Sequence, residues 1–125
     1  MSASPHAINW FEIPVTDFAR AKAFYEAVLG RPVETMNMGP STMGFLSSNP
    51  EGVGGAIVHG DGTAPSKSGT LVYLNGGDDL SPMLARVEGA GGSVAVPKTD
   101  IGSGFGFFAH FIDTEGNRVG LHSMG

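Results

Sequence analysis

The chain contains no cysteine among its 125 residues. Disulfides, thiolate metal sites and cysteine nucleophiles are therefore excluded. No apolar run approaches the roughly 20 residues that cross a membrane, and the N-terminus lacks the charged and apolar regions of a secretory signal. The net charge is −5 without any Lys/Arg run, which argues against nucleic acid and anionic membranes as partners. These absences predict a cytoplasmic protein of one domain.

Residues 8–30 read as a strand followed by a helix. Alternate side chains give the strand one apolar face: Phe11, Ile13 and Val15. Trp10 and Glu12 point to the opposite face. Thr16 or Asp17 can cap a helix whose apolar residues recur at helical spacing, and Gly30 ends it. The strand and helix should pack through their apolar faces.

The order strand–helix–strand–strand–strand occurs twice. Module one covers about residues 7–60, a linker about 61–69, and module two about 70–123. A shift of about sixty positions places Val58-His59-Gly60 on Leu121-His122-Ser123. This repeat predicts an α+β fold of pseudo-two-fold symmetry, in which the strand faces away from the helices curve around a shared concavity.

In module two we expect a short strand at 93–96, a turn-rich loop at 97–104 and a Phe-rich strand at 105–112. Residues 113–117, Asp-Thr-Glu-Gly-Asn, predict a hairpin turn. The glycine-rich residues 98–106 open no helix, so they are no dinucleotide fingerprint. They fit either a flap over the concavity or a long hairpin.

The pattern resembles the vicinal oxygen chelate superfamily, which includes glyoxalase I, bleomycin-resistance proteins and extradiol dioxygenases. Three segments carry the resemblance: residues 13–30, 85–92 and 111–122. It implies two βαβββ modules in a half-open mixed barrel, with a ligand or metal in the concavity. It also implies a homodimer.

Metalloenzymes of this family take His, Glu or Gln ligands from the first and fourth strand of each module. The corresponding positions here carry no oxygen or imidazole donor: Trp10, Ile57, Leu71 and Gly120. A divalent ion needs several such donors. We therefore predict no metal and no other cofactor.

Three polar side chains are candidates for chemistry. Glu12 could act as a base in an enclosed cavity, or be a solvated carboxylate on an open face. His59 and His122 occupy equivalent places in the repeat, and we expect both on the face away from the helices. They could bind a ligand, form a displaced metal site with Glu12, or lie on the rim. Glu12 and His122 are the candidate catalytic residues.

An apolar lining is expected around these groups, with Asn75 as a further polar contact. Its aromatic candidates are Trp10, Tyr73, Phe105 and Phe107. The alternative is that these aromatic residues belong to the core. Alternation does not fix the face of His110, which lies among Phe residues.

The sequence thus favours a metal-free protein that binds a small, partly apolar molecule in the concavity and forms a homodimer. An alternative is a metal-dependent lyase, isomerase or dioxygenase that uses the displaced site. A third is an interaction domain whose concavity is filled by its own side chains. Fold resemblance does not decide among them.

Overall fold

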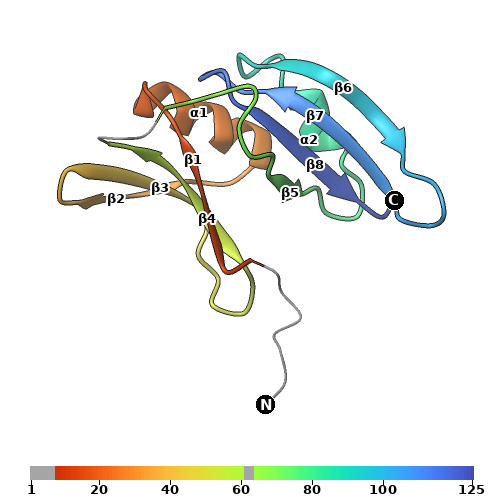
Figure 1. Cartoon of the computed structure of the whole chain (residues 1–125), viewed down its shortest axis with the longest axis horizontal. Coiled ribbons are helices and arrows are strands. Elements are labelled where there is room, and N and C mark those ends of the chain that lie inside the picture. The colour runs from red at the N-terminus through yellow and green to blue at the C-terminus, as the bar shows by residue number, and fades with distance from the viewer. Residues whose placement is uncertain (1–7, 61–63) are drawn as a thin grey trace.

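Two four-stranded sheets with one helix each make up the computed structural model, which describes residues 8–60 and 64–125 (Figure 1). The first module contains β1 (Trp10–Pro14), α1 (Phe18–Leu29), β2 (Glu34–Met38), β3 (Ser41–Ser47) and β4 (Gly54–His59). The second contains β5 (Tyr73–Asn75), α2 (Ser81–Arg86), β6 (Ser93–Asp100), β7 (Phe107–Ile112) and β8 (Arg118–Ser123). The predicted α+β class and the repeated βαβββ order are confirmed. Residues 61–63 of the expected linker lie outside the described residues.

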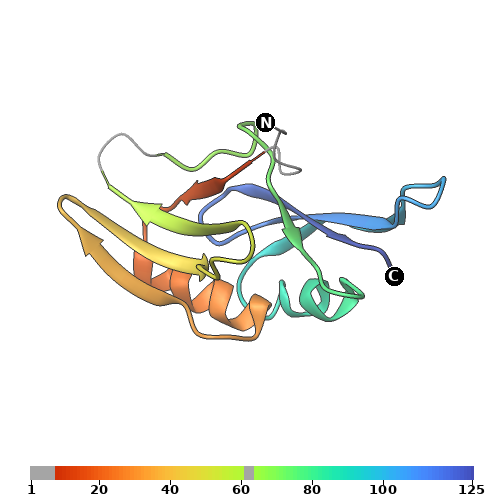
Figure 2. The ribbon, with the colours of Figure 1, turned by 90° about the horizontal axis from the view of Figure 1, so that it is seen from below.

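The strand order is β1-β4-β3-β2 in the first sheet and β5-β8-β7-β6 in the second. The pairs β1/β4 and β5/β8 are parallel, and the other pairs are antiparallel. Both helices lie on the same side of the two sheets, as Figure 2 shows. Each sheet therefore has a helix face, which is covered, and an open face.

The longer helix, α1, has the caps that the sequence predicts. The Asp17 side chain accepts a hydrogen bond from the Arg20 backbone N–H at 3.1 Å. Gly30 ends the helix at φ 74°, and its N–H bonds the carbonyl of Glu26. Within residues 8–60 and 64–125, no helix is long and apolar enough to cross a bilayer.

One continuous core joins the two modules. Ile13 pairs with Ile57 in the first sheet, and Leu74 with Leu121 in the second; all four side chains are buried on the helix faces. The α1 ring of Phe24 reaches into module two and lies 5.8 Å from the Phe111 ring, between centroids. The helix of the first module therefore also covers strands of the second.

The expected loop at 97–104 is wrong in its first part. β6 continues to Asp100, because register shifts between Val94 and Val96 and between Val96 and Thr99 let the strand pass Pro97. β7 begins at Phe107, two residues later than expected.

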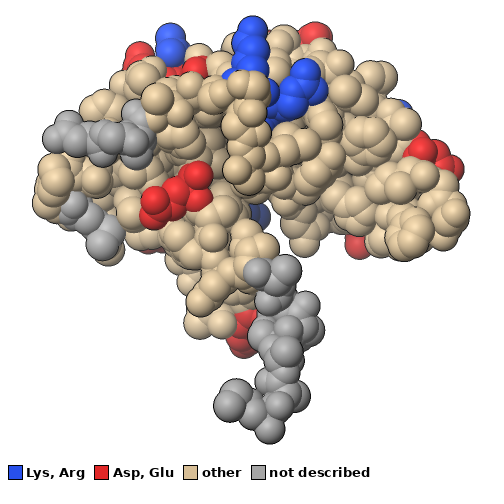
Figure 3. Space-filling view, in the orientation of Figure 1, with Lys and Arg blue, Asp and Glu red and all other residues tan. Residues whose placement is uncertain are grey.

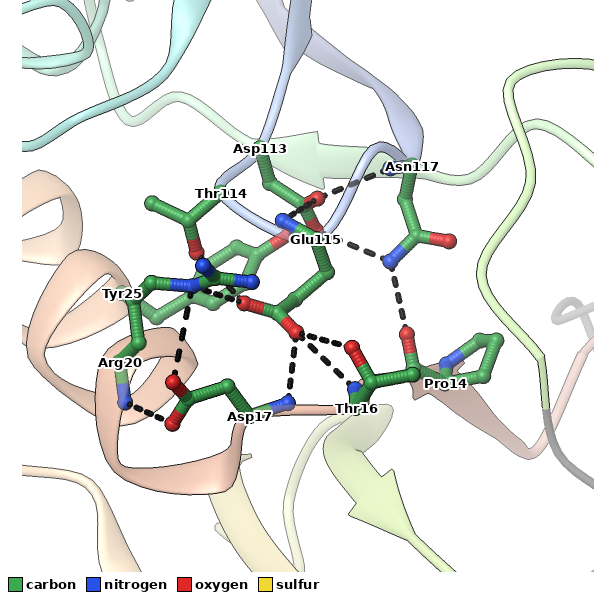
Figure 4. Close-up of polar contacts among 9 residues, drawn as sticks. All are labelled: Pro14, Thr16, Asp17, Arg20, Tyr25, Asp113, Thr114, Glu115 and Asn117. Carbon is green, nitrogen blue, oxygen red and sulfur yellow. Dashed lines mark hydrogen bonds and ion pairs between the residues drawn. The ribbon is translucent and has the colours of Figure 1, made fainter.

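The turn before β8, residues 113–117, binds the start of α1, and we call this set of contacts the clamp (Figure 4). Glu115 Oε1 accepts hydrogen bonds from the backbone N–H groups of Thr16 and Asp17, and Oε2 accepts one from Arg20 Nε at 2.9 Å. The Glu115 side chain is completely buried. Burial alone would raise the pKa of Glu115. The hydrogen bonds from these donors lower it by a larger amount, so the pKa is about 2.

Asp113, two residues before Glu115, holds the turn of the clamp in shape. This buried carboxylate accepts hydrogen bonds from the Tyr25 hydroxyl at 2.7 Å, from the Glu115 N–H and from Asn117. The Asn117 amide in turn donates to the carbonyl of Pro14 at 2.7 Å. Burial, followed by the charge of Asp113, raises the pKa of Tyr25 well above its usual value. The turn thus holds both β1 and α1 against module two.

Candidate functional site

A cavity of about 810 Å³ lies at the second sheet. Its polar lining includes Ser123 and three residues that lie on neighbouring strands and share the open face: Tyr73, Asn75 and His122. Its apolar lining is supplied mainly by Leu74, Ile101, Phe108 and Met124. A few polar groups in a mostly apolar hollow are typical of small-molecule sites.

Tyr73 reaches across this sheet because the strand beside it carries a glycine. Tyr73 pairs with Gly120, and Gly120 pairs with His110 on the next strand. A Cβ atom on Gly120 would collide with the Tyr73 ring, so the ring lies directly over the glycine. The Tyr73 hydroxyl is thereby brought to 2.7 Å from His110 Nε2.

His110 is also held from its other side. Arg118 Nη1 lies 3.0 Å from His110 Nδ1. Burial lowers the pKa of His110 below its usual value, and the positive charge of Arg118 lowers it further. Arg118, His110 and Tyr73 thus form a continuous polar chain on the open face of the second sheet.

His122 joins the same face to the loop at 101–106. Its Nε2 lies 2.8 Å from the carbonyl oxygen of Phe105, an acceptor, so Nε2 is the donor. Gly106 has φ 89°, and a Cβ there would collide with the Ser123 carbonyl. This contact between loop and strand fixes one edge of the cavity.

Trp10 and Glu12 lie together on the open face of the first sheet. The Trp10 indole N–H donates to Glu12 Oε2 at 3.3 Å, and its ring meets Phe45 edge-on at 6.0 Å between centroids. Neither residue lines the 810 Å³ cavity. The structure therefore does not bring Glu12 into one cavity with Tyr73, Asn75 and His122.

The expectation that His59 lies on the open face is wrong. β4 places Ile57 in the core against Ile13, and His59, two residues later, shares that helix face. The open-face positions of β4 are Gly54, Ala56 and Val58, of which Ala56 lies opposite Glu12. His59 and Glu12 are therefore on opposite faces of the first sheet.

Phe107 and Phe105 also differ from expectation. Phe107 is half-buried against the core with Lys98 Nζ 4.7 Å from its ring centroid, so it does not line the cavity. Phe108, the next residue along β7, takes that place. Phe105 is exposed in the loop before β7 and contributes its carbonyl oxygen rather than its ring.

The described side chains offer no cluster of ligands for a metal ion. Among residues 8–60 and 64–125, no three His, Asp or Glu side chains are close enough together to hold one. A displaced site made by Glu12, His59 and His122 is excluded by the opposite faces of Glu12 and His59. At Gly120, where the resemblance would place a ligand, the Tyr73 ring covers the backbone.

Three contributors to this site were missed or left open by sequence reasoning: His110, Arg118 and Phe108. The pairing of His110 with Gly120 settles its face, but that register depends on where β7 begins. Counting back from the hairpin turn at 113–117 would have placed His110 opposite Gly120, which lies two residues after Arg118 on β8.

A second cavity, of about 1190 Å³, lies between the modules. It is bordered by the turn before β4 and by β5, and apolar side chains from both modules line it, including Phe11, Leu46, Val72 and Met83. Arg31 stands at this cavity and donates to the Leu46 carbonyl at 2.7 Å.

Comparison with solved structures shows the same fold in several proteins. A glyoxalase/bleomycin resistance protein from Albidiferax ferrireducens T118 matches with a TM-score of 0.70 and 17% identity, over 93% of this chain and 97% of that one. A fosfomycin resistance protein from Listeria monocytogenes matches at 0.63 and 16%, over 96% and 92%. A mutant glyoxalase I from Zea mays matches at 0.68 and 17%, over 99% of this chain but 48% of its own.

No match is found among the curated proteins. A family model, in contrast, matches residues 7–121, nearly the whole chain. The repeated βαβββ module and the solved structures agree with that match. The chain belongs to the Glyoxalase/Bleomycin resistance protein/Dioxygenase superfamily.

Proposed function

We propose that the protein binds a small, partly apolar molecule in the cavity of the second sheet, without a metal ion. The observation that carries the proposal is the lining itself: Tyr73, Asn75 and His122 stand beside Phe108 and Ile101. The volume of the cavity, about 810 Å³, suits a small organic molecule. On the side of the molecule seen in Figure 3, most Lys and Arg side chains lie along the upper edge, where Asp and Glu also occur, and much of the remaining surface is uncharged.

Binding is tested with nitrobenzene, a small uncharged aromatic probe. We expect saturable NMR shifts at the backbone amides of Ile101, Phe108 and His122, which line only this cavity, together with a higher melting temperature. Phe108→Ala should weaken binding, whereas Phe45→Ala, on the other sheet, should not. Saturable shifts confined to the cavity between the modules would contradict the proposal.

The metal-free part of the proposal has a separate test. Elemental analysis of protein purified without chelator should find no stoichiometric transition metal or zinc, and a chelator should leave the melting temperature unchanged. A stoichiometric ion that is lost in Glu12→Ala or His122→Ala would overturn it.

We propose further that the protein is a homodimer. Large apolar side chains are exposed on the open strand faces and the loop beside them: Trp10, Met36, Tyr73 and Phe105. Exposed apolar side chains that form a contiguous patch mark interaction surfaces, and these four residues are the candidates for such a patch. Light scattering should give the mass of two chains at micromolar concentration, and Trp10→Lys should shift the protein toward a monomer.

A further inference from the structure

The chain Arg118–His110–Tyr73 fixes the direction of its hydrogen bonds. An arginine side chain only donates, so Arg118 Nη1 donates to His110 Nδ1 at 3.0 Å. Nδ1 therefore carries a lone pair, and the proton of the neutral imidazole is on Nε2. Nε2 then donates to the Tyr73 hydroxyl oxygen at 2.7 Å. The hydrogen of that hydroxyl cannot point back at His110 and is free for another acceptor.

The charge around this chain favours an anionic acceptor. Strands β5, β7 and β8 contain no Asp or Glu. Arg118 makes no ion pair with any side chain of residues 8–60 and 64–125. Its positive charge lies beyond His110 from Tyr73 and has no ion-pair partner among the described residues, although the chain as a whole carries −5. An anion would thus be attracted by this face and not by the protein in general.

We infer that the Tyr73 hydroxyl is a fixed hydrogen-bond donor to an oxyanion of the bound molecule, so that the ligand is a small carboxylate or phenolate with an apolar body. This inference rests on the proposed function. Tyr73 would bind the oxyanion, while Leu74, Ile101 and Phe108 would contact the apolar part. His110 and Arg118 are positioning residues for the Tyr73 hydroxyl, and Arg118 also contributes its positive charge to this face.

The first test needs no ligand. Long-range ¹H–¹⁵N spectra should show His110 as the neutral tautomer protonated at Nε2 near pH 7. Arg118→Leu should mix the two tautomers, and Arg118→Lys should restore the single one, since Lys also only donates. Arg86→Leu, which removes the same charge from α2, should leave the His110 spectrum unchanged. Protonation of His110 at Nδ1 in the wild-type protein would overturn the inference.

The second test compares two probes of nearly the same shape, benzoate and nitrobenzene. We expect the wild-type protein to bind benzoate about tenfold more tightly, the size expected for a charged hydrogen bond. Tyr73→Phe, which keeps the ring over Gly120, should abolish that preference without weakening nitrobenzene binding. Arg86→Leu should preserve the preference, which excludes a general charge effect.

The two proposals fail in different ways. Equal affinity for both probes, or an unchanged preference in Tyr73→Phe, would overturn the oxyanion inference and leave the proposed function standing. Absence of binding by both probes would overturn the proposed function, and the inference with it.

Discussion

The turns before β4 and β8 fold alike. Asn49 Oδ1 accepts a hydrogen bond from the Glu51 N–H at 2.9 Å, and Asp113 Oδ1 accepts one from the Glu115 N–H at 2.8 Å. Each is closed by a following glycine, whose N–H bonds the carbonyl of the first residue. The glutamates nevertheless have different surroundings: Glu115 is buried and clamps α1, whereas Glu51 is exposed and forms no ion pair within the described residues.

The difference lies in what each turn faces. Glu115 meets the free N–H groups at the start of α1 and the cation of Arg20. The corresponding start of α2 carries two acidic residues, Asp78 and Asp79. The turn before β4, which contains Glu51, borders the cavity between the modules. The molecule is therefore closed on one side of its pseudo-two-fold axis and open on the other. The two turns have the same local structure but stabilise the fold to different extents, because among the described residues only the turn before β8 contacts the start of a helix.

The largest expected effect comes from Asp113→Ala. It leaves the Tyr25 hydroxyl and the N–H groups of the turn without their buried acceptor, so we expect a loss of about 3–5 kcal/mol in the free energy of unfolding. The matched variant Asn49→Ala should lose less than about 1 kcal/mol. Urea unfolding measures both. Similar losses would mean that the two turns are not different in stability.

Glu115→Gln should cost about 2–3 kcal/mol, because the neutral amide is a weaker acceptor and loses the ion pair with Arg20. Glu51→Gln should change the free energy of unfolding by less than about 0.5 kcal/mol. If Glu51→Gln proves as destabilising as Glu115→Gln, the turn before β4 must also make stabilising contacts in solution.

Acid should weaken the closed side selectively. The folded-state pKa of Glu115 is about 2, below the usual 4.5, so its contribution is complete above about pH 4.5 and disappears as the pH falls toward 2. The stability gap between wild type and Glu115→Gln should shrink by about 2 kcal/mol over that range. Asp79, whose pKa is also about 2, is present in both proteins and cancels. A pH-independent gap would contradict this account.

Tyr25→Phe should cost about 1 kcal/mol, because Asp113 keeps its other donors and the ring keeps its packing against Phe24. Thermal and urea unfolding should agree on this value. A loss as large as that of Asp113→Ala would show that the hydroxyl, rather than the turn, is the main partner of the carboxylate.

The smallest effect is expected on the open side. Glu51→Lys would reduce the net negative charge of the chain, which is −5, and should raise the free energy of unfolding by at most about 0.5 kcal/mol, less at high salt. Glu51→Gln is the control for loss of the negative charge alone. A salt-independent gain would argue against an electrostatic cause.

The order of elements and the caps of α1 were predictable because they depend on local residues such as Asp17 and Gly30. The open faces were not, because a shift of one residue moves every side chain of a strand to the other face. The repeat paired His59 with His122, whereas the core pairs Ile57 with Ile13 and Leu121 with Leu74. That one-residue error placed His59 on the wrong face.

The clamp, in which residues 113–117 contact the start of α1, could not be predicted from the sequence. Residues 113–117 read as a simple hairpin turn, and nothing near them signals a contact with Thr16 or Arg20, almost a hundred positions earlier. For the same reason the role of Arg118 appeared only with the register of β7 and β8. Periodicity predicts elements, whereas tertiary partners of polar side chains depend on how the elements meet.

Gly120 restricts how this protein could change its chemistry. A larger residue there would displace the Tyr73 ring and break its bond to His110. A variant with an ion donor at position 120 would also have to lose the Tyr73 ring, because the two side chains would occupy the same space. Two neighbouring substitutions, at Tyr73 and Gly120, are therefore needed before this strand could offer a side chain to a cation.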